Sequence, residues 1–381
     1  MAIMPASNGG GALRSLAREL PLLVGALTVA VMFTIGEPWF DDPSNLFHSG
    51  LLFAWIFLVM LWCSFGVVRH ADHLAEALGE PYGTLILTLA VITIEVALIS
   101  AIMLTGADEP KLARDTMFAV LMIVLNGMVG LVLLVGGLRH RQQEFNVAGA
   151  NAFLAVLVPL SVFSLVLPSF TRATPDPSLS PMQAGFFAAV TVVLYGIFLT
   201  IQTVRHRRMF VAPSTEYAGS ESAGEEHPAS RGFIAFHAVL LVATMLPIVL
   251  LSKKLAVFVD YGVIQLEAPR ALGGLIVAIL VLTPEGLSAL QASLANQLQR
   301  SVNICLGSAV ATIGLTVPAV LGITLVTGAH VELGLDQVDM TLLGLTILVS
   351  MLTFGGGRTN ILQGAVHIVL FFAYLMLIFD P

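Results

Sequence analysis

Long apolar stretches alternate with short polar ones along almost the whole chain. A helix that crosses the roughly 30 Å hydrocarbon core of a membrane needs about 20 predominantly apolar residues. By that measure the pattern predicts about eleven membrane-spanning helices. They are centred in residues 21–36, 46–68, 83–104, 115–138, 149–168, 182–204, 232–251, 271–296, 302–327, 338–354 and 361–379. The stretch KKLAVFVDYGVIQ follows the seventh span and is apolar enough to extend that helix.

The composition supports the same fold class. Only 11% of the 381 residues are charged, whereas 57% are hydrophobic and the mean hydropathy is +0.93. A soluble protein of this length needs far more charged surface, so we expect an all-α integral membrane protein. Cys63 and Cys305 both lie in apolar stretches, which argues against a disulfide framework or a metal–thiolate site. The first apolar run has no obvious small-residue cleavage site, so we expect it to be retained as a span.

Arginine and lysine are distributed unequally over the two sides that these spans define. With the N-terminus in the cytoplasm, eleven of them, including Arg300, fall on the cytoplasmic side, and six, including Arg172, fall on the outer side. Positive residues accumulate in cytoplasmic loops. The bias therefore predicts a cytoplasmic N-terminus and a C-terminus on the periplasmic or outer side.

Two stretches of the chain resemble each other. GTLILTLAVITIEV, residues 83–96, aligns with GGLIVAILVLTPEG, residues 273–286, and the alignment places Glu95 over Glu285. Each stretch opens the second helix of a five-helix block, and an odd number of spans per block inverts the second copy. Inverted repeats that share a midplane site are an architecture of secondary transporters.

The pattern divides the chain into five parts. They are a cytoplasmic tail (1–20), an extra first helix with its loop (21–45), the first five-helix repeat (46–204), a polar, acidic cytoplasmic linker (205–231) and the second five-helix repeat (232–381). The linker is rich in glycine, serine and glutamate, which is typical of a solvated connection. Regulatory cation binding by its acidic residues is the alternative.

Glu95 and Glu285 are the only acidic residues deep within a predicted span. A charge at a helix centre costs about 2.5–3.5 kcal/mol on insertion scales, so two at equivalent repeat positions indicate a function. Buried carboxyl groups take up protons more readily than those in water, most of all beside a second carboxylate. Hard cations such as Ca²⁺ also prefer several oxygen ligands. The pair can therefore hold protons or a cation in turn, which is the chemistry of a cation/proton exchanger. Protonated glutamates that only hydrogen-bond between helices are the alternative.

Residues near the two glutamates can add neutral oxygen ligands. Pro284 lacks an N–H, so the carbonyl of Leu280 loses its helical partner and becomes a candidate ligand, a simple kink being the alternative. Thr93 and Thr283 each precede a glutamate by two residues. We expect all of these either to supply supporting ligands or to allow close packing.

Equivalent small or polar pairs occur on the next helix of each block. Asn126 and Gly127 lie on the first, and Gly307 and Ser308 on the second. These residue types allow close helix approach or supply neutral oxygens, and for each one packing is the alternative to ion binding.

These stretches resemble the cation/Ca²⁺ exchanger superfamily, and within it the Ca²⁺/H⁺ (CAX) antiporter family, with ChaA-type bacterial members the most similar. The resemblance covers the chain from about residue 46 to its end. It rests on TLAVITIEVALI, on VLTPEGLSALQASLANQLQRSVNICLGSAVATIGLTVPAVL and on FGGGRTNILQGAVHIVLFFAYL.

The resemblance implies that Glu95 and Glu285 alternately bind Ca²⁺ and protons. The Gly-Ser pair of the family is kept as Gly307 and Ser308 but reads Asn-Gly in the first repeat. Typical Ca²⁺/H⁺ members carry Gly-Asn shortly before each glutamate, whereas this chain has VIT and VLT there. The loss of that amide weakens the case for strict Ca²⁺ selectivity and fits the Na⁺ and K⁺ transport associated with ChaA-type proteins.

The sequence thus predicts an alternating-access antiporter of a bacterial inner membrane that exports Ca²⁺, and Na⁺ or K⁺ as further substrates, in exchange for H⁺. A monovalent Na⁺(K⁺)/H⁺ antiporter and a cation channel are the alternatives. The sequence shows no HExxH, paired-aspartate or Ser/His motif at membrane depth, so we do not expect an enzyme. We expect no cofactor beyond the transported ions, the lipid bilayer as partner, no nucleic acid, and a homo-oligomer as an open option. His237 and His367 lie within spans, where we expect them to hydrogen-bond between helices rather than relay protons.

Overall fold

The computed structural model describes residues 19–36, 39, 45–78, 86, 89–90, 92–97, 99–100, 110–212 and 230–380. These residues form an all-α membrane protein in which nine helices are long and apolar enough to cross a membrane. A further helix, α2 (Leu20–Thr34), is apolar but shorter. Large apolar side chains such as Phe47 and Val326 are exposed on the surface of these helices. Exposed apolar surface of this extent is expected where helices face lipid.

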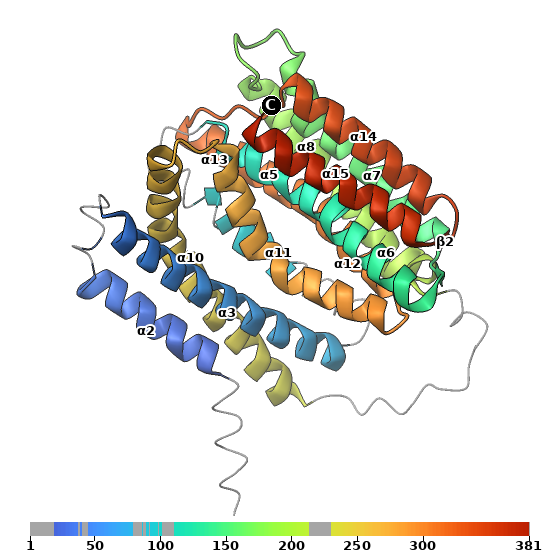
Figure 1. The fold of residues 1–381 in the computed structure, drawn as a ribbon, viewed down its shortest axis with the longest axis horizontal. Helices are drawn as coiled ribbons and strands as arrows, with labels where there is room; N and C mark the ends of the chain where they lie inside the picture. Colours follow the sequence, from blue (N-terminus) through green and yellow to red (C-terminus); the bar gives the residue numbers. More distant parts are fainter. Residues whose placement is uncertain are drawn as a thin grey trace, which may run out of the picture.

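Three helices form a separate group beside the main body of the protein (Figure 1). They are α2, α3 (Leu46–Leu78) and α10 (Arg231–Gln265). Their buried apolar side chains make one hydrophobic cluster. At Gly25 of α2 an added Cβ would lie 2.6 Å from the sulfur of Cys63 and 2.9 Å from Pro247. The absence of a side chain there lets α2 approach both partners closely. We call these three helices the outer group.

The remaining helices form the main body around a second hydrophobic cluster (Figure 1). From the first half of the chain come α5 (Leu112–Met122), η2 (Ile123–Met128), α6 (Val129–His140), α7 (Val147–Ser161), η3 (Val162–Val166), η4 (Leu167–Ser169), α8 (Pro181–Thr200), η5 (Ile201–Arg205) and η6 (Arg207–Phe210). From the second half come α11 (Ala271–Leu294), α12 (Leu298–Ala311), η7 (Thr312–Thr316), α13 (Val317–Thr327), α14 (Gln337–Phe354) and α15 (Ile361–Phe379).

Polar side chains fix where several of these helices begin. Ser180 and Asn360 each form a capping box, in which the cap side chain and the glutamine three residues later satisfy each other's backbone N–H groups. Free N–H groups at a helix start are costly in a membrane unless such partners are present. The caps therefore place α8 and α15 at defined depths.

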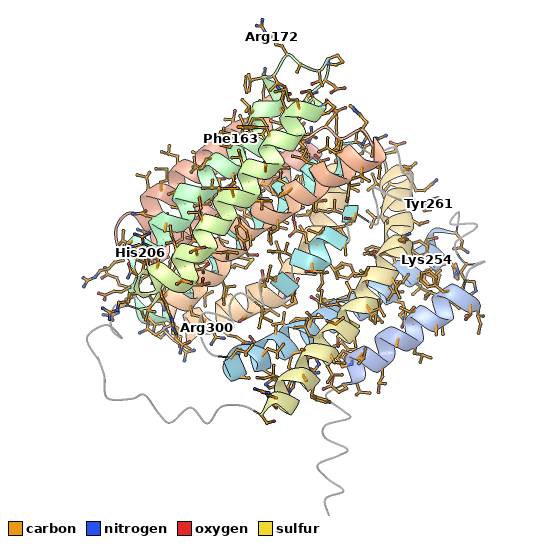
Figure 2. All side chains as sticks on the ribbon, turned by 180° about the vertical axis from the view of Figure 1, so that it is seen from behind. Phe163, Arg172, His206, Lys254, Tyr261 and Arg300 are labelled. Carbon is orange, nitrogen blue, oxygen red and sulfur yellow. The ribbon has the colours of Figure 1, made fainter. Side chains whose placement is uncertain are left out.

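A short antiparallel ribbon joins the two halves at one end of the main body. Strand β1 (Gln143–Glu144) pairs with β2 (Arg358–Thr359), and an ion pair links Arg358 to Glu144 at 2.6 Å. In Figure 2, His206 and Arg300 lie toward the same end, whereas Arg172 lies at the opposite end. This agrees with the predicted placement of Arg172 and Arg300 on opposite sides of the membrane.

Within the described residues nine of the predicted spans are confirmed, with differences at their ends, whereas the first, predicted at 21–36, is the 15-residue helix α2 and is shorter than those nine. The seventh is longer than its core of 232–251, because α10 continues through KKLAVFVDYGVIQ to Gln265. The helix α11 runs uninterrupted through Pro284, so the proline removes one hydrogen bond without ending the helix. The tail 1–18 and the linker residues 213–229 lie outside the described residues, and of the span predicted at 83–104 only parts are described.

We predict that Gly364→Ala lowers the thermal stability of the protein. An added Cβ at Gly364 of α15 would meet the backbone of Leu133 and Leu134 in α6, which cannot move aside as a side chain can. Overpacking of this kind costs about 1–3 kcal/mol. Thermal unfolding in detergent, followed by tryptophan fluorescence, measures the change. The control is Gly344→Ala on α14, where an added Cβ meets nothing within 4 Å. Equal melting temperatures for the two variants would contradict close packing of α6 and α15.

Candidate functional site

The two predicted glutamates are buried in the interior of the protein. Glu285 lies in the middle of α11 and its residue is 3% exposed, while Glu95 lies in the helical residues 92–97 and is 1% exposed. Gly286, directly after Glu285, lies against Met128 of η2, where an added Cβ would be 3.5 Å from the side chain. The small residue thus seats α11 on the first repeat at the depth of the carboxylate.

One helix of the second repeat contacts both carboxylates. The hydroxyl of Ser308 on α12 donates to Oε2 of Glu285 at 2.6 Å. The hydroxyl of Thr312, the first residue of η7, donates to Oε2 of Glu95 at 2.9 Å. Residues four apart on a helix lie on one face with their Cβ atoms about 5–6 Å apart. The structure therefore brings one carboxylate from each repeat to neighbouring turns of the same helix.

Around Glu95, the site contains polar atoms that can accept or donate further hydrogen bonds. The hydroxyl of Thr316, one turn beyond Thr312, faces the Glu95 carboxylate. Within the part of the chain that the structure describes, the Thr316 hydroxyl and Oε1 of Glu95 make no hydrogen bond of regular geometry, although a small movement of the hydroxyl toward the carboxylate would form one. A buried polar atom without a partner is costly. A proton on Oε1, or a cation between these oxygens, supplies the missing interaction.

The charges of the site are those of the two glutamates. Glu285 and Glu95 hydrogen-bond to neighbouring turns of one helix, so the two carboxylates share one interior site. Among the described residues, no group of three or more histidine, cysteine, aspartate or glutamate side chains is arranged to hold a metal ion. The donor set around the pair therefore consists of two carboxylates and the neutral hydroxyls of Ser308, Thr312 and Thr316.

Both helices that follow the glutamate helices contain a π-helical segment. In the first repeat η2 carries Asn126 and Gly127, and in the second η7 runs from Thr312 to Thr316. Segments of this kind often mark functional sites because they change the direction of side chains relative to a regular α-helix. Here η7 carries the two threonines that face Glu95.

The threonines predicted as supporting ligands make other contacts. Thr93 donates to the carbonyl of Leu89 and Thr283 to that of Ile279, each at 2.6 Å and each within its own helix. Thr93 is also exposed. Leu280 is buried, and its carbonyl faces Pro284 four residues on, which has no N–H to donate. Of these three residues, Leu280 is the one whose carbonyl lacks its usual helical donor, so it stays a candidate ligand.

The pair predicted on η2 also turns away from the carboxylates. The side-chain amide of fully buried Asn126 donates to Thr346 at 2.8 Å, and its oxygen lies 3.3 Å from Nδ1 of His367. Gly127 packs beside Phe371. Asn126 therefore links η2 to the last two helices, and His367 bonds between helices as predicted.

In the second repeat Gly307 packs beside Phe153, with 3.6 Å between an added Cβ and the ring. Of the four residues predicted on the two following helices, Ser308 is the one that hydrogen-bonds to a glutamate. Thr312 and Thr316 were not predicted. Their signal is the spacing of hydroxyl residues at 308, 312 and 316, which places them along one helix face.

Comparison with known proteins supports the resemblance seen in the sequence. The family described as sodium/calcium exchanger protein matches residues 48–204 and 235–379, which correspond closely to the two predicted repeats. The sodium-potassium/proton antiporter ChaA of Escherichia coli (strain K12) is 38% identical over 373 residues, which cover 98% of this chain and 100% of that protein.

Solved structures show the same fold at low sequence identity. The structure of native YfkE has a TM-score of 0.71 at 16% identity, covering 95% of this chain and 100% of that one. The crystal structure of the H⁺/Ca²⁺ exchanger CAX has a TM-score of 0.65, also at 16% identity, covering 92% and 88% of the two chains. The family model matches both repeats, and a relative is 38% identical to this chain along nearly its whole length. The chain therefore belongs to the sodium/calcium exchanger family.

Proposed function

We propose that the protein is a secondary antiporter that exchanges cations for protons across the inner membrane of a bacterium. The observation that carries this function is the hydrogen bonding of two buried carboxylates, one from each repeat, to successive turns of α12 and η7. Two anionic groups this close can be neutralised by protons or by a cation, and each ion displaces the other. Family membership and the 38% identical sodium-potassium/proton antiporter support the proposal.

The hydroxyl groups let the same oxygens serve both ions. A serine or threonine hydroxyl has one proton to donate and two lone pairs to offer. In the structure Ser308 and Thr312 donate to Glu285 and Glu95. When a cation binds, each hydroxyl can rotate and present its oxygen as a ligand while the carboxylate binds the same ion. When a proton binds instead, the hydroxyl bonds to the neutral carboxyl group.

We favour Na⁺ and K⁺ as the principal cations, with Ca²⁺ as the second candidate. The hydrogen-bond partners of the two carboxylates are neutral hydroxyls, and among the described residues no third carboxylate joins them in a group that could hold a metal ion. Ca²⁺ prefers six to eight oxygen ligands with several anionic ones. The sequence alone predicts Ca²⁺ as the first of the transported cations, so the structure changes this preference. The proximity of the two negative charges is the observation that keeps Ca²⁺ as a candidate.

The burial of the site favours exchange over conduction. Glu95 and Glu285 are 1% and 3% exposed, so neither is open to water on either side. A conducting channel needs a continuous aqueous path, whereas an alternating-access site passes through closed states. A transporter without a catalytic reaction fits this geometry.

We predict that Glu95→Gln and Glu285→Gln each abolish cation-driven proton flux. Glutamine keeps the shape and the hydrogen bond to the hydroxyl, but it cannot alternate between a proton and a cation. Everted vesicles with an imposed pH gradient, challenged with Na⁺, K⁺ or Ca²⁺ in turn, measure the flux and rank the ions. Near-normal flux in either variant, at matched protein levels, contradicts the shared site.

We predict that Thr312→Val raises the cation concentration for half-maximal flux by about tenfold or more. The substitution keeps the shape of the side chain but removes the hydroxyl that contacts Glu95, and a hydrogen bond to a charged group contributes about 1.5–3 kcal/mol. The matched control is Thr324→Val on α13, whose hydroxyl donates to the carbonyl of Val320 in its own helix. If the two variants behave alike, Thr312 has no direct part in ion binding.

We further predict that a cysteine at Arg172 is labelled from outside the cell and one at Arg300 is not. The charge bias of the loops puts Arg300 in the cytoplasm, and the two residues lie at opposite ends of the protein (Figure 2). Intact cells and a membrane-impermeant maleimide provide the measurement, in a background that lacks Cys63 and Cys305. Labelling of position 300 alone would reverse the proposed orientation, and labelling of both would contradict the span count.

A further inference from the structure

A cluster of titratable side chains lies at one end of the outer group, remote in the sequence from the two glutamates. Nδ1 of His70 on α3 lies 3.0 Å from Nδ1 of His237 on α10. Nε2 of His70 lies 3.1 Å from Oε2 of Glu19, the residue that precedes α2, and Arg69 donates to the same oxygen at 3.0 Å. A single histidine ring thus connects all three helices of the outer group. We call Glu19, Arg69, His70, His73 and His237 the histidine cluster.

The two paired rings of the cluster are shielded from water, whereas the side chains of Arg69 and Glu19 are 29% and 21% exposed. His70 is fully buried and His237 is 9% exposed. The ring of His237 also lies against Phe233 and His73, with centroids 4.4 and 4.7 Å away. The charged or titratable groups whose fields reach the two paired histidines are Glu19 from α2, and Arg69 and His73 from α3. A change of charge at the pair is therefore poorly screened by solvent.

The contact between the two Nδ1 atoms accommodates one proton and no more. Nε2 of His70 lies 3.1 Å from Glu19 and 3.2 Å from Nη2 of Arg69, whose own hydrogen bond goes to Glu19. In a neutral pair whose Nε2–H donates to Glu19, Nδ1 of His70 accepts from Nδ1–H of His237. One added proton binds Nε2 of His237 while the proton between the two Nδ1 atoms shifts to His70, so that His70 donates from both nitrogens, to Glu19 and to His237. A second added proton places N–H groups on both facing Nδ1 atoms and positive charges on both rings. The hydrogen bond is then replaced by repulsion at a distance of 3.0 Å.

We propose that His70 and His237 form a second proton-binding site, separate from Glu95 and Glu285, that holds α3 against α10 until both rings are protonated. The geometry that carries it is the Nδ1–Nδ1 contact between the two helices, anchored to α2 through Glu19. Protonation of both rings separates the ends of α3 and α10. The site thus senses the pH on the side of the membrane where α2 begins.

The consequence for transport follows from what the outer group covers. Val277, Leu280 and Val281 of α11, which lie in the two turns before Glu285, belong to the same hydrophobic cluster as α3 and α10. Separation of α3 and α10 weakens the packing over this stretch of α11. We therefore expect acid on that side to slow exchange even when the cation site is saturated. This consequence rests on the proposed antiport, whereas the separation of the helices does not.

The test compares the full-length protein with His237→Asn, in which the amide can hydrogen-bond to His70 in either protonation state and carries no charge. Exchange is measured at saturating cation while the pH on each side of the membrane is varied in turn. Saturation removes competition between protons and cations at the glutamates. We expect the wild-type rate to fall about tenfold as the pH on one side drops below about 6.5, the ordinary histidine value, because both buried rings must be protonated against their mutual repulsion. In His237→Asn the fall should be less than about twofold.

A second variant and a control separate a sensor from a merely structural cluster. Glu19→Gln removes the negative charge that favours protonated His70, so the midpoint of the fall should move to lower pH. His206→Asn removes a titratable, exposed histidine elsewhere, and its profile should match the wild type. If the cluster had only a structural role, His237→Asn and Glu19→Gln would lower the exchange rate by the same factor at every pH.

A distance measurement tests the site without transport. Spin labels on Leu78→Cys and Arg231→Cys, at neighbouring ends of α3 and α10, should move apart in acid in the wild type and not in His237→Asn. The background lacks Cys63 and Cys305. Unchanged pH profiles and distances in both His237→Asn and Glu19→Gln would overturn the sensor and leave the antiport intact. A wild type that transports no cation would instead overturn the antiport, and the label distances would still decide the sensor.

Discussion

Everything at the centre of this protein depends on keeping two carboxylates buried and close together. An isolated charge in hydrocarbon is strongly disfavoured, and a second like charge nearby increases the cost. The structure reduces that cost with hydrogen bonds from Ser308 and Thr312, which lie on adjacent turns of one continuous stretch of helix. Because these two donors are fixed relative to each other by the backbone, the spacing of the carboxylates is set by α12 and η7.

The sequence was sufficient to find the carboxylates but not all of their partners. Glu95 and Glu285 are easy to recognise, because a charge within an apolar span is rare and two at matching repeat positions are rarer. A threonine in a helix gives no such signal, since its hydroxyl can always bond to the carbonyl one turn back. Thr93 and Thr283 do this, and Thr312 does not. Thr93 and Thr283 were predicted as ligands because they lie close to the glutamates in the sequence. The fold instead brings Thr312, from the opposite repeat, to Glu95.

The dependence of side-chain contacts on the fold also explains the other differences between the sequence predictions and the structure. The apolar pattern located the spans, because membrane helices must satisfy their backbone groups internally and so need long apolar stretches. It also indicated that the seventh helix could extend through KKLAVFVDYGVIQ, and α10 does continue to Gln265. The pattern could not show that Asn126 faces α14 and α15, because side-chain direction within a buried helix depends on the neighbours. The π-helical segments η2 and η7 have no sequence signature in this chain that we recognise.

The network around Asn126 also bears on how the chain is assembled. Its two partners, Thr346 and His367, lie 220 and 241 residues further along the chain. A ribosome synthesises about 5–20 residues per second, so Asn126 enters the membrane many seconds before either partner exists. Until α14 and α15 are inserted, its amide remains in the bilayer without these hydrogen bonds. The first repeat is therefore an incomplete unit by itself, and its final packing is a late event in biogenesis that depends on the last two helices.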